Sequence, residues 1–125
     1  HTITAQRCRD RMEAARIMVK EAKEFGYLEE YHEEIESSFT TLFYVNTLFS
    51  YMAGVKPIRF SFVKKMGEEM RKTFPGFREN KYYLTRVHEE ERKLIDLQMR
   101  STLCFILYYR LLLAYRSFRK WVKRV

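Results

Sequence analysis

Glycine and proline are scarce in this chain, with four glycines and two prolines among 125 residues. Because these residues form turns and end helices, their scarcity leaves room for few loops and predicts an all-α protein. Only two cysteines occur, Cys8 and Cys104, and they are far apart in the sequence. This spacing excludes a disulfide framework and a cysteine-based metal site, so we interpret both residues as buried thiols of a cytosolic protein.

Long apolar runs are also missing. The longest run, residues 103–115, is interrupted by Arg110. It is shorter than the roughly 18 consecutive apolar residues that identify a membrane-spanning helix. We therefore expect this segment to lie on a membrane surface at most and not to cross the bilayer.

Motifs of catalysis and cofactor binding are absent as well. The sequence contains no Gly-rich phosphate loop, no HExxH or GxSxG pattern and no DxD pair. Glu29 and His32 form one Glu-x-x-His pair, which is half of a di-iron carboxylate site. The other half is missing, because Thr85 stands three residues before His88 where a glutamate is needed. We therefore predict no catalytic, metal-binding or cofactor-binding residue and interpret Glu29 and His32 as a solvated helix turn.

Positive charge is abundant but unevenly distributed. The net charge is +8; residues 1–62 contain 8 Lys and Arg against 9 Asp and Glu, whereas residues 63–125 contain 16 against 7. The basic character therefore belongs to the C-terminal half. Such an excess is typical of a surface that faces anionic lipid, nucleic acid or an acidic protein, and also of ordinary solvated helix faces.

Apolar residues spaced by three and four predict a single helical domain over residues 1–125. The predicted helices cover residues 5–25, 28–53, 58–74 and 85–124. Thr4 is expected to cap the first helix and Gly26 to end it, while residues 1–4 are interpreted as the remnant of an upstream linker. The stretch Ser37–Thr41 contains weak helix formers and predicts a local irregularity. Short connections favour about four helices in a largely antiparallel bundle.

The long basic C-terminal helix is the most informative element. Unbroken, it would measure about 60 Å at about 1.5 Å per residue, so we expect a kink or an overhang. Its end interleaves aromatic and basic residues without any acid. The candidate membrane-surface residues are Arg110, Tyr115, Arg116, Arg119, Lys120, Trp121, Lys123 and Arg124.

Three interpretations of this basic aromatic end stay open. An amphipathic helix of this composition lies well at an anionic membrane interface, with Trp and Tyr at headgroup level. The same pattern also serves RNA, through phosphate contacts and stacking, but nucleic acid is the less favoured partner. In the third interpretation the aromatic residues belong to a core and the cations are merely solvated.

Residues 65–84 read KMGEEMRKTFPGFRENKYYL. Their central segment, Phe74–Tyr82, resembles the region that follows the catalytic domain in bacterial family 2 glycosyltransferases of the GT-A type. The opening residues HTITAQRC are similar to the segment that follows the last catalytic-domain strand in that family. The closing residues RSFRKWVKRV are similar to the family's basic tails.

The resemblance implies a C-terminal accessory module without catalytic activity of its own, in a parent protein that transfers a sugar from a nucleotide-sugar donor to a cell-surface glycan or a lipid-linked acceptor. Its expected partners are the catalytic domain of the parent chain and the anionic inner face of the cell membrane, which makes the module cytoplasmic and peripheral. Self-association is also expected.

The polar turn formed by Arg78, Asn80 and Lys81 is a candidate functional turn, because polar connections between helices often carry function. Asn80 can equally act only as a helix cap. The alternative to the glycosyltransferase interpretation is a free-standing basic helical module that binds nucleic acid or a protein.

Overall fold

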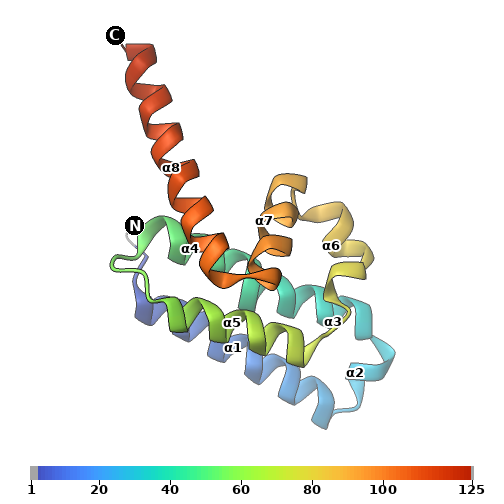
Figure 1. Cartoon of the computed structure of the whole chain (residues 1–125). Helices are drawn as coiled ribbons and strands as arrows, with labels where there is room; N and C mark the ends of the chain where they lie inside the picture. Colours follow the sequence, from blue (N-terminus) through green and yellow to red (C-terminus); the bar gives the residue numbers. More distant parts are fainter. Residues whose placement is uncertain (1–2, 125) are drawn as a thin grey trace. The chain divides into compact units, whose positions relative to one another are not determined.

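Every regular element in the computed structural model, which describes residues 3–124, is helical (Figure 1). The all-α class is therefore confirmed, whereas the count of about four helices is wrong because the helices are more numerous and shorter. The chain forms two compact units: unit 1 ends at His88 and unit 2 begins at Glu89. The single domain and the antiparallel bundle stay predictions. His1 and Thr2 of the expected linker remnant lie outside the described residues.

Helix α1 (Ala5–Glu24) begins at the predicted residue and ends one residue before the predicted end. The Thr4 hydroxyl accepts a hydrogen bond from the Arg7 amide at 3.1 Å and so caps the helix. Gly26 follows the helix with a φ of +77°, in the left-handed region that glycine adopts without a steric penalty. The buried residues of α1 are Cys8, Met12 and Ala15, spaced by four and three.

The second predicted helix, residues 28–53, is divided. Its parts are α2 (Tyr27–Glu30), α3 (His32–Phe39), a π-helix (Thr40–Val45) and α4 (Asn46–Gly54). Tyr31 separates α2 from α3 with a ψ of +37°. The Thr40 hydroxyl donates to the Glu36 carbonyl at 2.6 Å, so that a side chain competes with the backbone for helix hydrogen bonds where the π-helix begins. The irregularity expected near Ser37–Thr41 thus occurs at the end of that stretch.

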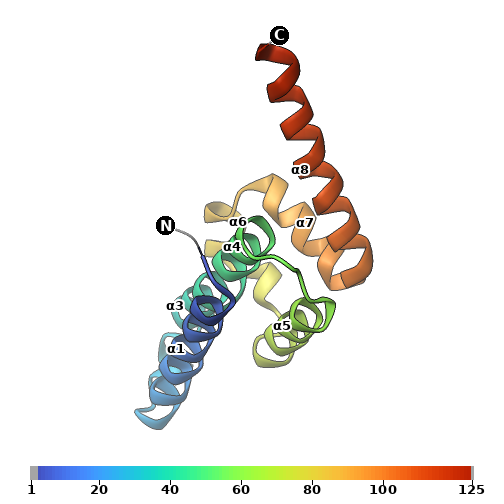
Figure 2. The same cartoon turned by 90° about the vertical axis from the view of Figure 1, so that its left-hand side faces the viewer.

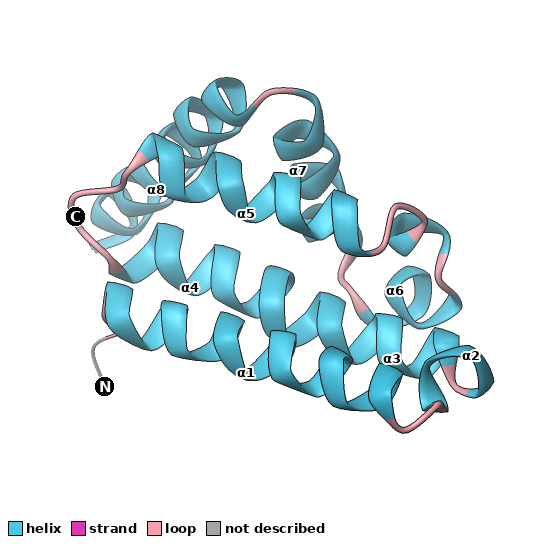
Figure 3. Cartoon of the chain, turned by 90° about the horizontal axis from the view of Figure 1, so that it is seen from below, coloured by secondary structure: helices cyan, strands magenta, loops and turns pink. Residues whose placement is uncertain are grey.

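Unit 1 has an aromatic core, which is formed by α1, by the segment from α3 to α4 and by α5 (Phe60–Thr73). Figure 3 shows α1 and α4 side by side. Phe39 stacks on Phe43 with ring centroids 4.6 Å apart and lies 5.4 Å from Phe74. Tyr44 meets Phe77 edge to face at 5.7 Å. Phe77 opens a short 3₁₀-helix, Phe77–Glu79, which follows the predicted stop at Pro75. These contacts join the turn after α5 to the middle of the unit.

The prediction of one helix over residues 85–124 is wrong, because the structure divides this segment. The structure has α6 (Lys81–Arg86), α7 (Glu89–Arg100) and α8 (Thr102–Arg124), the last a continuous helix in Figure 2. Val87 is extended, with φ −82° and ψ 129°, and separates α6 from α7. Ser101 separates α7 from α8, and its hydroxyl accepts a hydrogen bond from the Cys104 amide at 3.2 Å. The Ser101 side chain therefore starts a new helix without the Gly or Pro that usually ends one.

Candidate functional site

The candidate functional turn is built around a buried asparagine. Asn80 is only 4% exposed, and its side-chain oxygen caps α6 by accepting hydrogen bonds from the Tyr82 amide at 2.8 Å and the Tyr83 amide at 3.4 Å. Its Nδ2 donates to the Glu33 carbonyl at 3.0 Å and to Glu36 Oε1 at 2.8 Å. Asn80 thereby satisfies a buried carboxylate and fastens the turn to α3. Its role is to hold the fold together.

The other two residues of the turn, Arg78 and Lys81, are exposed. Lys81 pairs with Glu33 at 3.1 Å, and this hydrogen bond raises the pKa of the Lys81 ammonium. Lys81 also lies over the Tyr82 ring at 5.2 Å, and the Arg86 guanidinium lies over it at 4.5 Å. The Lys81 charge thus has one partner in α3 and one in the neighbouring Tyr82 ring.

Tyr82 continues the same surface cluster toward α3. Its hydroxyl donates to Glu34 Oε2 at 3.0 Å. A backbone hydrogen bond first, and this phenol second, lower the pKa of the Glu34 carboxyl. The cluster joins α6 to α3 through polar contacts, as Asn80 does in the interior.

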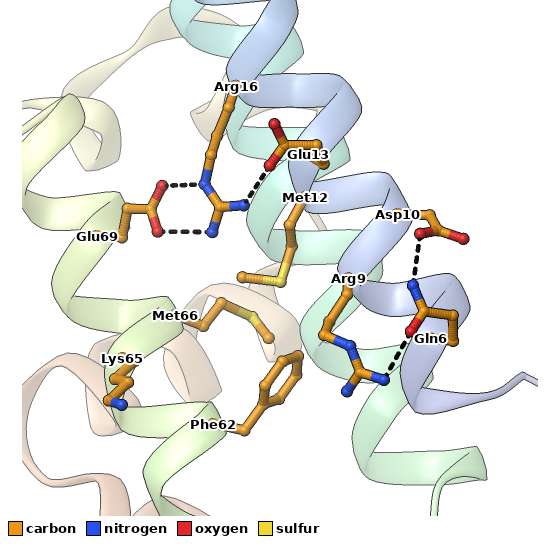
Figure 4. Close-up of a pocket in the computed structure, with 10 residues that line it drawn as sticks. All are labelled: Gln6, Arg9, Asp10, Met12, Glu13, Arg16, Phe62, Lys65, Met66 and Glu69. Atoms are coloured by element: carbon orange, nitrogen blue, oxygen red, sulfur yellow. Dashed lines mark hydrogen bonds and ion pairs between the residues drawn. The ribbon is translucent and has the colours of Figure 1, made fainter.

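A groove of about 450 Å³ lies between α1 and α5 (Figure 4). Arg16 closes one end with two hydrogen bonds to Glu69, at 2.6 and 2.8 Å, and a third to Glu13 at 3.1 Å. Met12 and Met66 point into its centre beside Phe62. Both methionines are buried, so the groove offers a ligand little of their surface. The residues that line it include no set of acid, base and nucleophile.

Glu29 and His32, the Glu-x-x-His pair of the sequence, lie at the surface. Both are exposed, and His32 meets Phe74 edge to face at 5.6 Å. Among the described residues, no three His, Cys, Asp or Glu side chains gather as a metal ion requires.

Helix α8 differs from every other described helix in what it exposes. One face is buried through Phe105, Ile106 and Tyr109. The opposite face covers about 140° of the helix circumference, at 3.6 residues per turn, and exposes only apolar and aromatic side chains. We call this face the exposed stripe. Its large residues are Leu103, Leu107, Tyr108, Leu111, Tyr115, Phe118, Trp121 and Val122.

The side chains of the stripe are largely exposed to solvent. Leu111 is 69%, Phe118 61% and Trp121 62% exposed, so these side chains belong to no core in the described chain. Large apolar residues exposed in a continuous row mark an interaction surface. The interpretation in which the aromatic residues of this end are core residues is therefore wrong for Tyr115 and Trp121.

The predicted basic residues lie on α8 outside the exposed stripe. Arg116 pairs with Glu90 of α7 at 2.8 Å, within unit 2. Four further cations form no ion pair with any described residue: Arg119, Lys120, Lys123 and Arg124. At helical spacing Lys120, Lys123 and Arg124 lie on the side away from the stripe, while Arg110 and Arg119 lie at its two edges. Between Thr102 and Arg124 there is no acidic residue.

The sequence analysis missed the first half of the stripe. Leu103, Leu107 and Tyr108 are each more than half exposed, although they lie in the longest apolar run. The available signal was the spacing: Leu103, Leu107 and Leu111 follow one another at about one helical turn, and Tyr108 precedes Tyr115 by about two turns. Cys104 lies beside them and is exposed, so its interpretation as a buried thiol is wrong, whereas Cys8 is buried as predicted.

Burial raises the pKa of the Cys8 thiol, and the nearby Arg11 and Arg9 oppose this rise.

Over residues 3–124, no helix combines the length and apolar character needed to cross a bilayer. Comparisons with family models, with curated proteins and with solved structures found no match.

Proposed function

We propose that this chain is a helical accessory module that attaches to an anionic membrane surface through α8. The observation that carries the proposal is the arrangement of α8 itself. A continuous exposed apolar stripe runs along a helix that contains six Lys and Arg and no acid. No other described helix exposes such a row.

The physical basis is that of an interfacial amphipathic helix. Lying in the plane of the membrane, α8 would bury its stripe at the boundary between headgroups and acyl chains. Trp121 and Tyr115 would place their rings at headgroup level. Arg119, Lys120 and Lys123 would attract lipid phosphates from the headgroup side. At about 1.5 Å per residue, the 23 residues of α8 give about 35 Å of contact.

The resemblance at Phe74–Tyr82 supports the further proposal that the parent protein is a family 2 glycosyltransferase. In that proposal the module packs on the catalytic domain, with its helices in a largely antiparallel bundle. It holds the enzyme at the inner face of the cell membrane. The parent enzyme would move a sugar from a nucleotide-sugar donor to a glycan or lipid-linked acceptor. Sequencing the gene upstream of this region tests this part, because the proposal requires a GT-A-type domain there.

Co-sedimentation with vesicles of increasing anionic lipid content tests membrane attachment. The decisive variant replaces Arg119, Lys120, Lys123 and Arg124 by Gln, which leaves the pair between Arg116 and Glu90 intact. Each cation near an anionic surface contributes about 1 kcal/mol, so the variant should bind up to roughly 1,000-fold more weakly.

A matched control removes four exposed lysines of unit 1. It replaces Lys20, Lys23, Lys64 and Lys72 by Gln. The total charge change is the same, so the control separates the α8 surface from net charge. Equal loss of vesicle binding in both variants would contradict attachment through α8. An RNA competitor that displaces the protein from vesicles at physiological salt would favour the nucleic-acid alternative.

A further inference from the structure

A regular row of residues lies in the middle of the exposed stripe. These residues repeat at spacings of three and four, the pattern of the contact positions of a coiled coil. We call the row the α8 seam; it consists of Cys104, Leu107, Leu111, Ala114, Phe118 and Trp121. All six are exposed. The seam lies opposite Phe105 and Tyr109, which are buried, so it is not used within unit 2.

We propose that a second copy of the chain covers this seam in solution, with the two α8 helices antiparallel. The sizes of the seam residues carry the orientation. An antiparallel pair centred between Leu111 and Ala114 places Cys104 opposite Trp121, Leu107 opposite Phe118 and Leu111 opposite Ala114. Small residues then face large ones in two of the three layers, as close packing requires.

A parallel pair would combine the same residues badly. It would place Ala114 against Ala114 and Cys104 against Cys104, which leaves space between the helices. It would also place Trp121 against Trp121 in one layer. Voids and overpacking both destabilise a contact. The seam is therefore complementary to a second seam that runs antiparallel to it, and not to one that runs parallel in the same register.

Charge along α8 favours the same orientation. The part of α8 before Arg110 contains no charged residue, whereas five cations follow between Arg116 and Arg124. In an antiparallel pair each basic end lies beside the uncharged half of the other helix. A parallel pair would bring both sets of five cations together at one end, where like charges repel within the Debye length of about 8 Å at physiological salt.

The antiparallel pair regulates the surface assigned to membrane attachment, and this step rests on the proposed function. The seam residues cannot contact a second α8 and the bilayer at once. Anionic vesicles should therefore dissociate the pair, and the pair should reduce membrane binding at high protein concentration.

Disulfide trapping of the whole chain tests the orientation. In the Trp121→Cys variant, oxidation should form a disulfide between the introduced thiol of one copy and the native Cys104 of the other, identified by peptide mass mapping. Within one chain these positions are 17 residues apart along the helix, about 26 Å, so this disulfide cannot form within a single straight α8. A disulfide between two Cys104 residues in the wild-type protein would overturn the antiparallel arrangement.

A size exchange at the centre tests the packing without cysteine chemistry. By sedimentation, Ala114→Leu should raise the dimer dissociation constant about tenfold or more, because two large residues then meet. Combining it with Leu111→Ala should restore association. A parallel pair predicts the opposite for Ala114→Leu, and a wild-type chain that stays monomeric up to millimolar concentration would overturn the pairing. A dimer that ignores vesicles would contradict the proposed function and leave the dimer standing.

Discussion

Unit 1 and helix α8 of unit 2 are both rich in aromatic residues, but unit 1 buries many of them and α8 exposes most of them. Phe39 and Phe43 in unit 1 are at most 1% exposed, whereas Phe118 and Trp121 in α8 are more than 60% exposed. The difference lies in the neighbouring helices. In unit 1, several helices surround the core. In unit 2, α7 has 12 residues and α8 has 23, so α7 can cover only about half the length of α8, at equal rise per residue.

The comparison teaches that aromatic content does not by itself indicate a core. A helix buries its aromatic residues only where another element is long enough to cover them. Where none is, the residues are available to a membrane or to another chain. Matched substitutions in the two regions test this difference.

Truncation of one phenylalanine in each region should give the largest contrast. Phe39→Ala removes a ring that stacks on Phe43 at 4.6 Å and should lower the free energy of unfolding by about 3–5 kcal/mol. Phe118→Ala should change it by less than about 0.5 kcal/mol, because the ring is exposed in the folded chain. It should instead weaken vesicle binding. Urea unfolding measures the first effect and co-sedimentation the second; equal destabilisation by both variants would contradict the comparison.

Substitutions of two neighbouring residues in the polar turn should differ by a smaller amount in the free energy of unfolding. Asn80→Ala removes the cap of α6 and leaves Glu36, which is 6% exposed, without its amide partner. We expect a loss of about 3 kcal/mol in urea unfolding. Lys81→Ala breaks an exposed ion pair and should cost less than about 0.5 kcal/mol. A Lys81 variant as unstable as the Asn80 variant would show that the surface cluster, and not the buried amide, holds the turn.

Ion pairs give a third and weaker contrast. Arg16 joins α1 to α5 through two hydrogen bonds to Glu69, in a site where both side chains are at least one third exposed. Allowing for solvent screening, Arg16→Gln should cost about 1 kcal/mol. Arg116→Gln breaks the more exposed pair with Glu90 in unit 2 and should cost less than about 0.5 kcal/mol. Thermal unfolding of both variants at two salt concentrations measures the difference, and a larger loss for Arg116→Gln would reverse the order.

Much of the fold could be predicted from local signals. Thr4 and Gly26 mark the ends of α1 because their chemistry acts within one helical turn. The break at Ser101 could not be predicted with the same ease. Serine occurs in helix interiors as well as at caps, and only the structure shows that its hydroxyl accepts from the Cys104 amide.

The candidate surface was predicted in part. The basic residues and Trp121 were found because an acid-free basic aromatic end is visible in composition alone. The part of the stripe from Leu103 to Tyr108 was not found, because an apolar run in a sequence has the same pattern whether its partner is a core or a solvent-exposed surface. Asn80 illustrates the opposite limit. Its cap was predictable, but its bond to Glu36, 44 residues away, depends on tertiary packing.

The buried face of α8, opposite the stripe, can be tested through Tyr109. The expected effect, a change in how stability depends on pH, is the smallest of those proposed. Burial raises the pKa of its phenol above the ordinary value of 10.0; the nearby Arg116 opposes this shift and Glu91 adds to it. The unfolded chain therefore loses this proton first. As pH rises through about 10, the free energy of unfolding should fall, and the fall should continue until the folded phenol also ionises. Tyr109→Phe keeps the ring and removes the ionisation, so the variant should lose less stability than the wild type between about pH 8 and about pH 11. Urea unfolding of both proteins across that range measures the difference. Identical slopes would mean that Tyr109 is as solvated in the folded chain as in the unfolded one, and α8 would then have no buried face at this position.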